Sequence, residues 1–180
     1  MMAEARVKFT YEDYKTLPAE KRYELLEGEL VMVPSPKEYH QRISGKLEFL
    51  LRAFVQDHAL GVVYDAPFDV VLSEETVVQP EIIFISKERL DIITEDNVRG
   101  APDLVIEILS EATAERDRIA KRLLYAKYGV KEYWLVDPQT KSIEVLQLGE
   151  RGFDLVGIFW EGQKMRSPLL GMELEPAEVF

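Results

Sequence analysis

The stretch Leu104-Val105-Ile106-Glu107-Ile108-Leu109 places one carboxylate among branched aliphatic side chains that are typical of a strand buried on both faces. A second stretch, Val77-Val78-Gln79-Pro80-Glu81-Ile82-Ile83-Phe84-Ile85, is also predicted to be a buried strand and carries Glu81. Removing a carboxylate from water is costly unless a cation or hydrogen-bond donors meet it. Two such residues on strands that can pair suggest a site for a divalent metal. The alternative is a pair of strand-end carboxylates that backbone amides or basic side chains satisfy.

Around these strands, hydrophobic periodicity and turn residues predict a mixed α/β (α+β) fold with helices on each side of a central β-sheet. A long amphipathic helix is predicted over Tyr39–His58, and a second helix over Thr113–Tyr128 with Ile119, Leu123 and Leu124 facing inward. Two shorter helical segments are expected, a helix from Thr10 to Leu17 and a short helix or turn at Lys87–Ile93. The other expected strands lie in a hairpin over Tyr23–Val33 that turns at Gly28, at Val62–Tyr64, Phe68–Leu72 and Tyr133–Val136, and in an edge hairpin of Ser142–Leu148 with Phe153–Trp160. A polar loop is expected at Asp96–Pro102. No linker or repeat interrupts this order, so residues 1–180 are predicted to form one domain.

Composition narrows the class of protein. The chain has 180 residues, a formal net charge of −11, no cysteine and two histidines. Disulfides and thiolate metal sites are thereby excluded, a histidine-rich zinc site is disfavoured, and a reducing cytoplasm is the expected compartment. No apolar run approaches the roughly 20 residues of a membrane span, and Met1–Phe9 has no apolar segment resembling a signal peptide.

The acidic charge lowers the expectation of nonspecific duplex binding, because such proteins normally carry a basic face. Cations nevertheless gather in two segments, which are Lys37, Arg42, Lys46 and Arg52 in the first and Arg116, Arg118, Lys121, Arg122 and Lys127 in the second. Most of these side chains are predicted to lie on the solvated faces of two helices. A local basic rim is the alternative.

Several motifs resemble a known family. They are Glu24-Leu25-Leu26-Glu27-Gly28-Glu29-Leu30, Val78-Gln79-Pro80-Glu81, Ala101-Pro102-Asp103-Leu104-Val105-Ile106-Glu107-Ile108-Leu109-Ser110, and Tyr128-Gly129-Val130-Lys131-Glu132-Tyr133-Trp134-Leu135-Val136-Asp137-Pro138. In this order they are similar to the Uma-type family of restriction-endonuclease-like proteins, a branch of the PD-(D/E)XK nuclease superfamily. The resemblance spans about Thr10 to Phe180. It implies a restriction-endonuclease-like core and Mg²⁺-dependent hydrolysis of phosphodiester bonds in nucleic acid, expected to be DNA, with Mn²⁺ as a substitute.

The resemblance also implies a set of site residues. In the superfamily, adjacent strands present a proline-acidic motif and a later acidic-x-lysine motif. Pro80-Glu81 matches the first motif, Glu107-Ile108-Leu109 matches the second, and Glu24 aligns with an accessory acid. Glu81 and Glu107 are therefore expected to be catalytic metal ligands, with Glu24 completing the metal site.

Two positions depart from the family pattern. Glu81 stands where the family usually has Asp, and the extra methylene moves the carboxylate outward by about one bond length, which matters to a metal that demands octahedral geometry. Leu109 occupies the lysine position. A lysine from a helix is thought to substitute in the family, and Lys121 is the candidate catalytic residue. An ordinary i,i+4 ion pair with Asp117 is the alternative for Lys121.

Three further polar residues are expected to have structural roles. Asp103 follows a proline and mimics the first motif, but it lies only four positions before Glu107 and is predicted to start the same strand. Asp137 is predicted to be a turn residue. His40 is expected in a solvated position at the start of the long helix, with an approach to phosphate as the alternative.

Taken together, the residues and the resemblance predict a metal-dependent endonuclease. The alternative is a catalytically degenerate nuclease-fold protein that acts as a binding or assembly module, which Glu81, Leu109 and the acidic charge favour. A homodimer is expected if a partner covers the C-terminal apolar residues Leu169, Leu170 and Met172, and these residues could equally fold back on the sheet.

Overall fold

The computed structural model describes residues 7–18 and 20–180 of the chain. Residues 1–6 lie outside the described residues, and so does most of the Met1–Phe9 segment, in which no signal peptide was expected. The helical segments are α1 (Tyr11–Tyr14), α2 (Glu38–Asp57), 3-10 turns at Lys87–Ile92 and Pro176–Glu178, α3 (Ala114–Arg116), a π-helical turn at Asp117–Lys121, and α4 (Arg122–Tyr128). The strands are β1 (Tyr23–Leu26), β2 (Glu29–Met32), β3 (Gly61–Asp65), β4 (Asp69–Ser73), β5 (Thr76–Val78), β6 (Ile82–Ser86), β7 (Asn97–Arg99), β8 (Leu104–Ile108), β9 (Glu132–Asp137), β10 (Ser142–Gly149), β11 (Gly152–Trp160), β12 (Met165–Arg166) and β13 (Glu173–Leu174).

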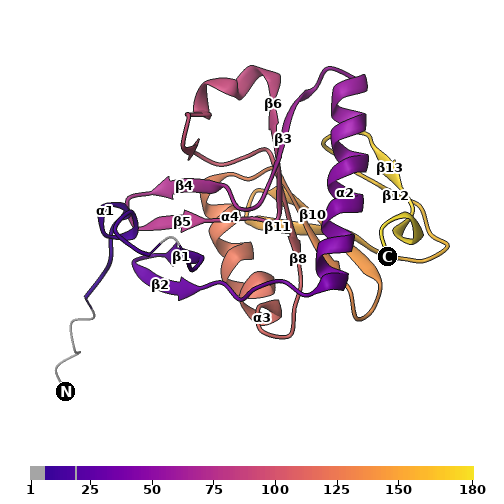
Figure 1. Ribbon diagram of the computed structural model, residues 1–180. Coiled ribbons are helices and arrows are strands. Elements are labelled where there is room, and N and C mark those ends of the chain that lie inside the picture. The colour runs from indigo at the N-terminus through magenta and orange to yellow at the C-terminus, as the bar shows by residue number, and fades with distance from the viewer. Residues whose placement is uncertain (1–6, 19) are drawn as a thin grey trace.

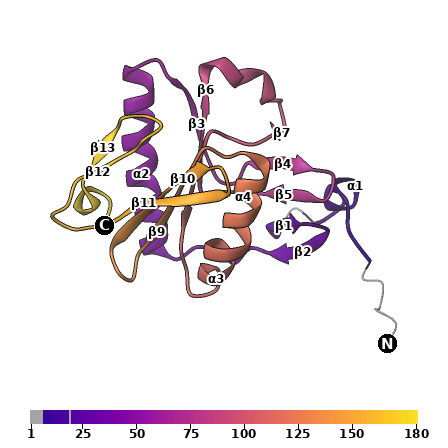
Figure 2. The same ribbon diagram turned by 180° about the vertical axis from the view of Figure 1, so that it is seen from behind.

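The strands form a larger and a smaller mixed sheet, with β12 and β13 as a separate pair. The larger sheet has the order β11-β10-β9-β8-β6-β3, and only its β8–β9 pair is parallel among the described residues. The smaller sheet has the order β2-β1-β5-β4-β7. Helix α2 covers one face of the larger sheet, and α3 and α4 cover the other (Figure 1, Figure 2). This is the mixed α/β (α+β) architecture expected from the sequence.

Strand β8 runs between two hydrophobic cores, and every one of its residues is buried, as predicted. Leu104, Ile106 and Ile108 pack in the core beneath α2, whereas Val105 packs in the core beneath α4. Successive side chains of a strand alternate between its faces, so Glu107 lies on the α4 side. Strand β8 pairs with β6, and the two strands expected to be neighbours are therefore neighbours.

The segment predicted as one strand over Val77–Ile85 is instead two strands in different sheets. Strand β5 ends at Val78 in the smaller sheet, and β6 begins at Ile82 in the larger one. Pro80 between them has no N–H to donate to a ladder, which favours the break at this point. Glu81 consequently precedes a strand and does not lie within one. The polar loop predicted over Asp96–Pro102 also contains a short strand, β7, which pairs with β4.

The helix predicted over Thr113–Tyr128 is present, but two of its three predicted inward residues were wrong. Ile119 is 58% exposed and Leu123 is 68% exposed, whereas Leu124 is buried as expected. The segment is divided into α3, the π-helical turn and α4, and its C-terminus has Gly129 in the left-handed conformation at φ 85°.

Polar side chains occupy the inner face of this helical segment. Asp117 and Lys121 are buried at the two ends of the π-helical turn. The sheet surface beneath them carries Glu107. A cation stabilises a buried carboxylate, whereas an aliphatic side chain in the same place would leave it unpaired. Apolar periodicity alone therefore selected the wrong face.

The C-terminal segment folds back over the α2 side of the larger sheet (Figure 1). Met172 is buried in that core, and Leu169 and Leu170 pack against it. The fold-back alternative is therefore the arrangement found, and the homodimer stays a prediction without support from these three residues. Within the described residues, no helix has the length and apolar character needed to cross a membrane.

Candidate active site

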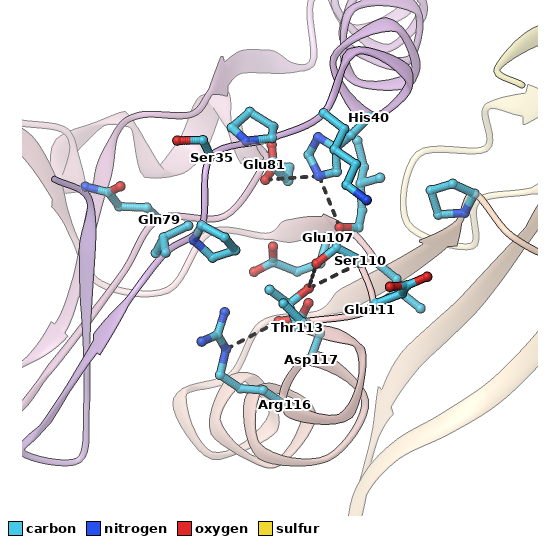
Figure 3. Close-up of a pocket in the computed structure, with 18 of the residues that line it drawn as sticks. Ser35, His40, Gln79, Glu81, Glu107, Ser110, Glu111, Thr113, Arg116 and Asp117 are labelled. Carbon is cyan, nitrogen blue, oxygen red and sulfur yellow. Dashed lines mark hydrogen bonds and ion pairs between the residues drawn. The ribbon is translucent and has the colours of Figure 1, made fainter.

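A cavity of about 300 Å³ opens where β8 ends, between the start of α2 and the start of α3 (Figure 3). Loops supply much of its wall. Its lining comprises Glu24, Val33–Lys37, Tyr39, His40, Gln79, Glu81, Glu107–Thr113, Arg116, Asp117, Lys121, Pro138 and Gln139. All four residues that the sequence assigned to the site, including Lys121, thus line one cavity.

Lys121 joins two of the predicted acids directly. Its Nζ donates hydrogen bonds of 2.8 Å to Oε1 of Glu24 and of 2.8 Å to Oε1 of Glu107. The side-chain exposures are 3% for Lys121, 1% for Glu24 and 5% for Glu107. Tyr125 Oη donates a further 2.8 Å bond to Glu107, and the backbone N–H of Gln79 donates a 2.9 Å bond to Glu24. The three charged groups are therefore held in fixed positions.

The lysine position two residues after Glu107 has become part of the core. Leu109 is buried and packs in the hydrophobic cluster beneath α4. Lys121 reaches Glu107 from the facing helix, which is the arrangement that the family resemblance implied. The predicted ion pair with Asp117 is also present, at 3.6 Å from Lys121 Nζ to Oδ1, and the catalytic role of Lys121 stays a prediction.

Glu81 lies on another wall of the cavity, beside His40 (Figure 3). The His40 Nε2 atom is 3.5 Å from Glu81 Oε1 and 3.2 Å from the backbone oxygen of Ile108. The His40 side chain is only 12% exposed, so the expectation of a solvated position was wrong. The N-terminal turn of α2 packs over the end of β8 and carries His40 into the site, a tertiary contact that local sequence does not encode.

Sequence reasoning missed Arg116 as a site residue and gave Asp117 only a helix ion pair. Arg116 Nε is buried without a hydrogen-bond partner, and so are Asp117 Oδ1 and Glu24 Oε2. The guanidinium of Arg116 approaches each of these two oxygens to 4.0 Å, which is an ion-pair distance beyond hydrogen bonding. In the sequence, the spacing of Asp117 and Lys121 at positions i and i+4 is the one signal that points to the group formed by Arg116, Asp117 and Glu24.

Burial and charge shift the pKa values of the site in different directions. Burial raises the pKa of Glu107 to about 8, with Asp117 and Glu24 adding to the effect of burial against the opposing Lys121. Burial likewise raises the pKa of Glu81 despite His40 and Arg22. For Glu24, by contrast, Lys121 overcomes burial and lowers the pKa. The same acids raise the pKa of Lys121 against burial, so Lys121 stays a cation.

The donor set fits a hard divalent cation in its chemistry. Carboxylate oxygens are the ligands that Mg²⁺ prefers, and Mg²⁺ keeps several waters, so one or two carboxylates with substrate phosphate suffice. Burial is the main cause of the raised pKa values of Glu81 and Glu107. A bound cation would stabilise the ionised form that burial disfavours, and Glu24 Oε2 lacks a hydrogen-bond partner. No three histidine or carboxylate side chains of the described residues already converge as a metal centre. The Lys121 ammonium lies between Glu24 and Glu107.

Two other acids have the structural roles that were predicted. Asp103 is fully buried, accepts a 2.8 Å bond from the N–H of Ser86, and pairs with Arg89 and Lys131 at 3.0 and 2.7 Å. Asp137 caps the turn after β9 by accepting a 2.9 Å bond from the N–H of Gln139.

A mixed sheet between helices, with acids at the end of a central strand and a lysine against them, defines the chain as a restriction-endonuclease-like protein. The chain belongs to the family described as "Uma2: Putative restriction endonuclease", whose sequence model matches residues 11–177. The solved structures that match include a "putative nuclease belonging to DUF820 from Anabaena variabilis ATCC 29413", with a TM-score of 0.80, 20% identity and coverage of 96% of this chain and 97% of that one. This likeness shows the fold. No curated protein matches the chain in sequence.

Proposed function

We propose that the chain is a metal-dependent nuclease that hydrolyses phosphodiester bonds of nucleic acid, expected to be DNA, with Mg²⁺ or Mn²⁺. Membership of a family described as restriction endonucleases supports this proposal. The observation that carries it is the contact of Lys121 Nζ with both Glu24 and Glu107, at 2.8 Å each, in a cavity that Glu81 also lines. An acid pair with a fixed ammonium is suited to phosphoryl chemistry, in which negative charge must be offset.

The proposed reaction consumes one water. The water oxygen bonds to phosphorus, the bond from phosphorus to one ester oxygen breaks, and the departing oxygen takes a proton, which leaves a phosphate monoester and a hydroxyl. A bound Mg²⁺ would lower the pKa of the water and offset charge on the phosphate.

The chain's own residues have separable roles in this scheme. Glu81 and Glu107 are the proposed principal ligands, with Glu24 as an accessory ligand. Lys121 keeps its proton because the neighbouring acids raise its pKa, so it acts as a charge stabiliser and not as a base. Tyr125 and the N–H of Gln79 hold Glu107 and Glu24 in orientation.

A second candidate is a nuclease-fold protein that binds nucleic acid or assembles with a partner without cleaving. The absence of a preformed three-ligand group among the described residues favours it. Lys121 supports it too, because its ammonium already pairs with two of the three predicted ligands, Glu24 and Glu107.

A cleavage assay with purified protein tests the proposal. Wild type is expected to cut with Mg²⁺ or Mn²⁺ and to stop when the metal is chelated, while Glu107→Gln and Lys121→Met are expected to lose at least about a hundredfold in rate. Lys127→Met is the matched control, since Lys127 lies on the same helical segment but is exposed and pairs with Glu27. Equal cleavage by wild type and Glu107→Gln would refute the assignment. Calorimetric titration with Mn²⁺ then separates the candidates, because a binding module without a metal site gives no heat above background.

A further inference from the structure

The Glu81 carboxylate is held by fewer contacts than the other two proposed ligands. Glu107 and Glu24 each accept two hydrogen bonds from buried or backbone donors. Within the described part of the chain, the one basic side chain that pairs with Glu81 is that of His40, with 3.5 Å between Nε2 and Oε1. The orientation of the Glu81 carboxylate therefore depends on His40.

The backbone fixes the position of Glu81 but not the direction of its carboxylate. The ladder between β6 and β8 ends at the pair Ile82 and Ile106, one residue short of Glu81 and Glu107. On the other side, the backbone oxygen of Glu81 accepts a 3.0 Å bond from the N–H of Ala66. A glutamate has one more rotatable side-chain bond than an aspartate, so its carboxylate can take more positions from the same backbone. A contact to the side chain itself is needed to select one of them.

The His40 ring supplies this contact through one defined nitrogen. Its Nε2 atom lies 3.2 Å from the backbone oxygen of Ile108. Because a carbonyl oxygen can only accept a hydrogen bond, Nε2 carries a hydrogen in either protonation state of the ring. The same nitrogen is the atom that faces Oε1 of Glu81 (Figure 3). One N–H thus connects Glu81 to the end of β8, the strand that carries Glu107.

The His40 ring is itself held in place. It lies in the first turn of α2, and its side chain is only 12% exposed. Further along the same helix, Ile43 and Leu47 are fully buried in the core against the larger sheet. The helix therefore presents the ring to the cavity from a fixed position, which is what a residue that orients another side chain requires.

From these contacts we infer that His40 is a positioning residue, which orients the Glu81 carboxylate for binding of a divalent cation. The inference rests on the proposed function, because the ligand role of Glu81 is proposed there. His40 is not itself a ligand in this arrangement, since Nε2 donates to the Ile108 oxygen and Nδ1 is buried without a hydrogen-bond partner. Loss of a donor that orients a metal ligand typically weakens metal binding about 10–100-fold.

Two amide substitutions test the inference by separating the two ring nitrogens. The amide nitrogen of glutamine lies close to the position of Nε2, whereas that of asparagine lies close to the position of Nδ1. In calorimetric titration with Mn²⁺, His40→Gln should keep Kd within about threefold of wild type, and His40→Asn should raise it at least about tenfold. The matched control is His58→Asn at the exposed C-terminal end of α2, which should leave Kd unchanged. An unchanged Kd in His40→Asn, or an equal loss in His40→Gln, overturns the inference.

A double-mutant cycle tests whether His40 acts through Glu81. Glu81→Asp keeps the charge but shortens the side chain, so its carboxylate has fewer positions and lies farther from Nε2. Adding His40→Asn to Glu81→Asp should therefore change the Mn²⁺ Kd by less than about twofold. Binding that stays unimpaired there also shows that His40→Asn folds. An undiminished tenfold loss would mean that His40 acts by another route, and the inference is then overturned.

The titrations and the cleavage assay together separate this inference from the proposed function. If wild type cuts nucleic acid and His40→Asn binds Mn²⁺ as wild type does, the hydrolysis stands and the role of His40 is refuted. If His40→Asn alone of the two amide variants loses Mn²⁺ affinity but wild type does not cut, the role of His40 stands and the hydrolysis fails. If wild type binds no Mn²⁺, both are overturned.

Discussion

The Lys121→Met substitution is the sharpest test of how the site is built. It removes an ammonium that lies 2.8 Å from two buried carboxylate oxygens and 3.6 Å from a third carboxylate. The linear methionine side chain fills similar space, so the change isolates the charge. Glu24 and Glu107 then remain buried with no ammonium between them.

Removing one partner of a buried ion pair costs about 3–5 kcal/mol, because the remaining charge stays desolvated. For a chain of this length, 1 kcal/mol corresponds to about 2–4 °C in Tm. We therefore expect Lys121→Met to lower Tm by about 6–20 °C at pH 8. The matched Lys127→Met change removes an exposed cation and should alter stability by less than about 1 kcal/mol.

The loss should depend on pH with a definite sign. In wild type, Lys121 lowers the pKa of Glu24 below its ordinary value of 4.5 against the opposing effect of burial, and in the variant burial raises the pKa of this acid in the folded chain above that value. A carboxyl with a raised folded pKa destabilises the fold only where the unfolded chain would be ionised, so the penalty is absent below about pH 4.5 and grows as pH rises towards the folded pKa. Wild type and variant should therefore differ least near pH 5 and most near pH 8.

Urea unfolding followed by tryptophan fluorescence provides the assay, because Trp134 is fully buried beneath α2 and reports loss of the core. Adding Glu107→Gln to Lys121→Met should recover about 0.5–3 kcal/mol, as the unpaired charge is then gone. The reasoning is refuted if Lys121→Met is as stable as Lys127→Met at pH 8, or if its deficit is larger at pH 5 than at pH 8.

Three further predictions follow from other contacts. Arg116→Met should raise KM for nucleic acid at least about tenfold with little change in Tm, because its buried Nε lacks a partner and is suited to phosphate; Arg118→Met, which breaks pairs with Asp137 and Glu144 outside the cavity, should leave KM unchanged. Asp103→Asn should cost on the order of 3 kcal/mol at pH 7, measured by urea unfolding. Burial raises the pKa of Asp103, but hydrogen bonds and charges from Lys131, Ser86 and Arg89 lower it by more, so that the pKa lies below its ordinary value of 3.8. The contribution of Asp103 to the free energy of unfolding is therefore lost as pH falls below 3.8, and the stabilities of wild type and Asp103→Asn should then become equal. Chelation of divalent metal should abolish cleavage and Mn²⁺ should restore it, whereas a rate that persists after dialysis against chelator contradicts metal dependence.

Sequence patterns predicted the parts of this fold that local physics determines. The aliphatic residues on both sides of Glu107 predicted a buried central strand, and β8 is buried along its whole length. Helix α1 begins after Thr10, as expected, with a capping box in which the side chains of Thr10 and Asp13 each accept a hydrogen bond from the other residue's backbone N–H. The turn at Gly28 has φ 90°, a conformation in which glycine avoids the strain of a side chain. Each of these features depends on residues close together in the chain.

The parts that were wrong depend on distant residues. Whether the chain crosses from one sheet to the other at Pro80 depends on which strands are available as partners, and β5 and β6 belong to different sheets. The burial of His40 depends on α2 packing over the end of β8. Neither contact leaves a periodic signal, so the positions of Glu81 and His40 relative to each other could not be read from spacing.

The inward facing of Lys121 is the clearest case, and it explains how a helix lysine can replace the missing strand lysine. The π-helical turn runs from Asp117 to Lys121, and the backbone oxygen of Asp117 accepts a 3.0 Å bond from the buried Tyr133 hydroxyl of β9. Such turns are frequent at functional sites because they re-aim side chains within a helix. Here the turn is stabilised by Tyr133 beneath it and by Glu24 and Glu107, which accept hydrogen bonds from Lys121. Contacts with the sheet therefore turn Lys121 inward, whereas the apolar periodicity of the sequence predicted that other residues face inward. Tyr133→Phe should therefore loosen the turn and reduce the proposed cleavage that depends on Lys121, while leaving the proposed metal binding by Glu81 and Glu107 in place. An unchanged rate would show that the turn holds its position without this bond.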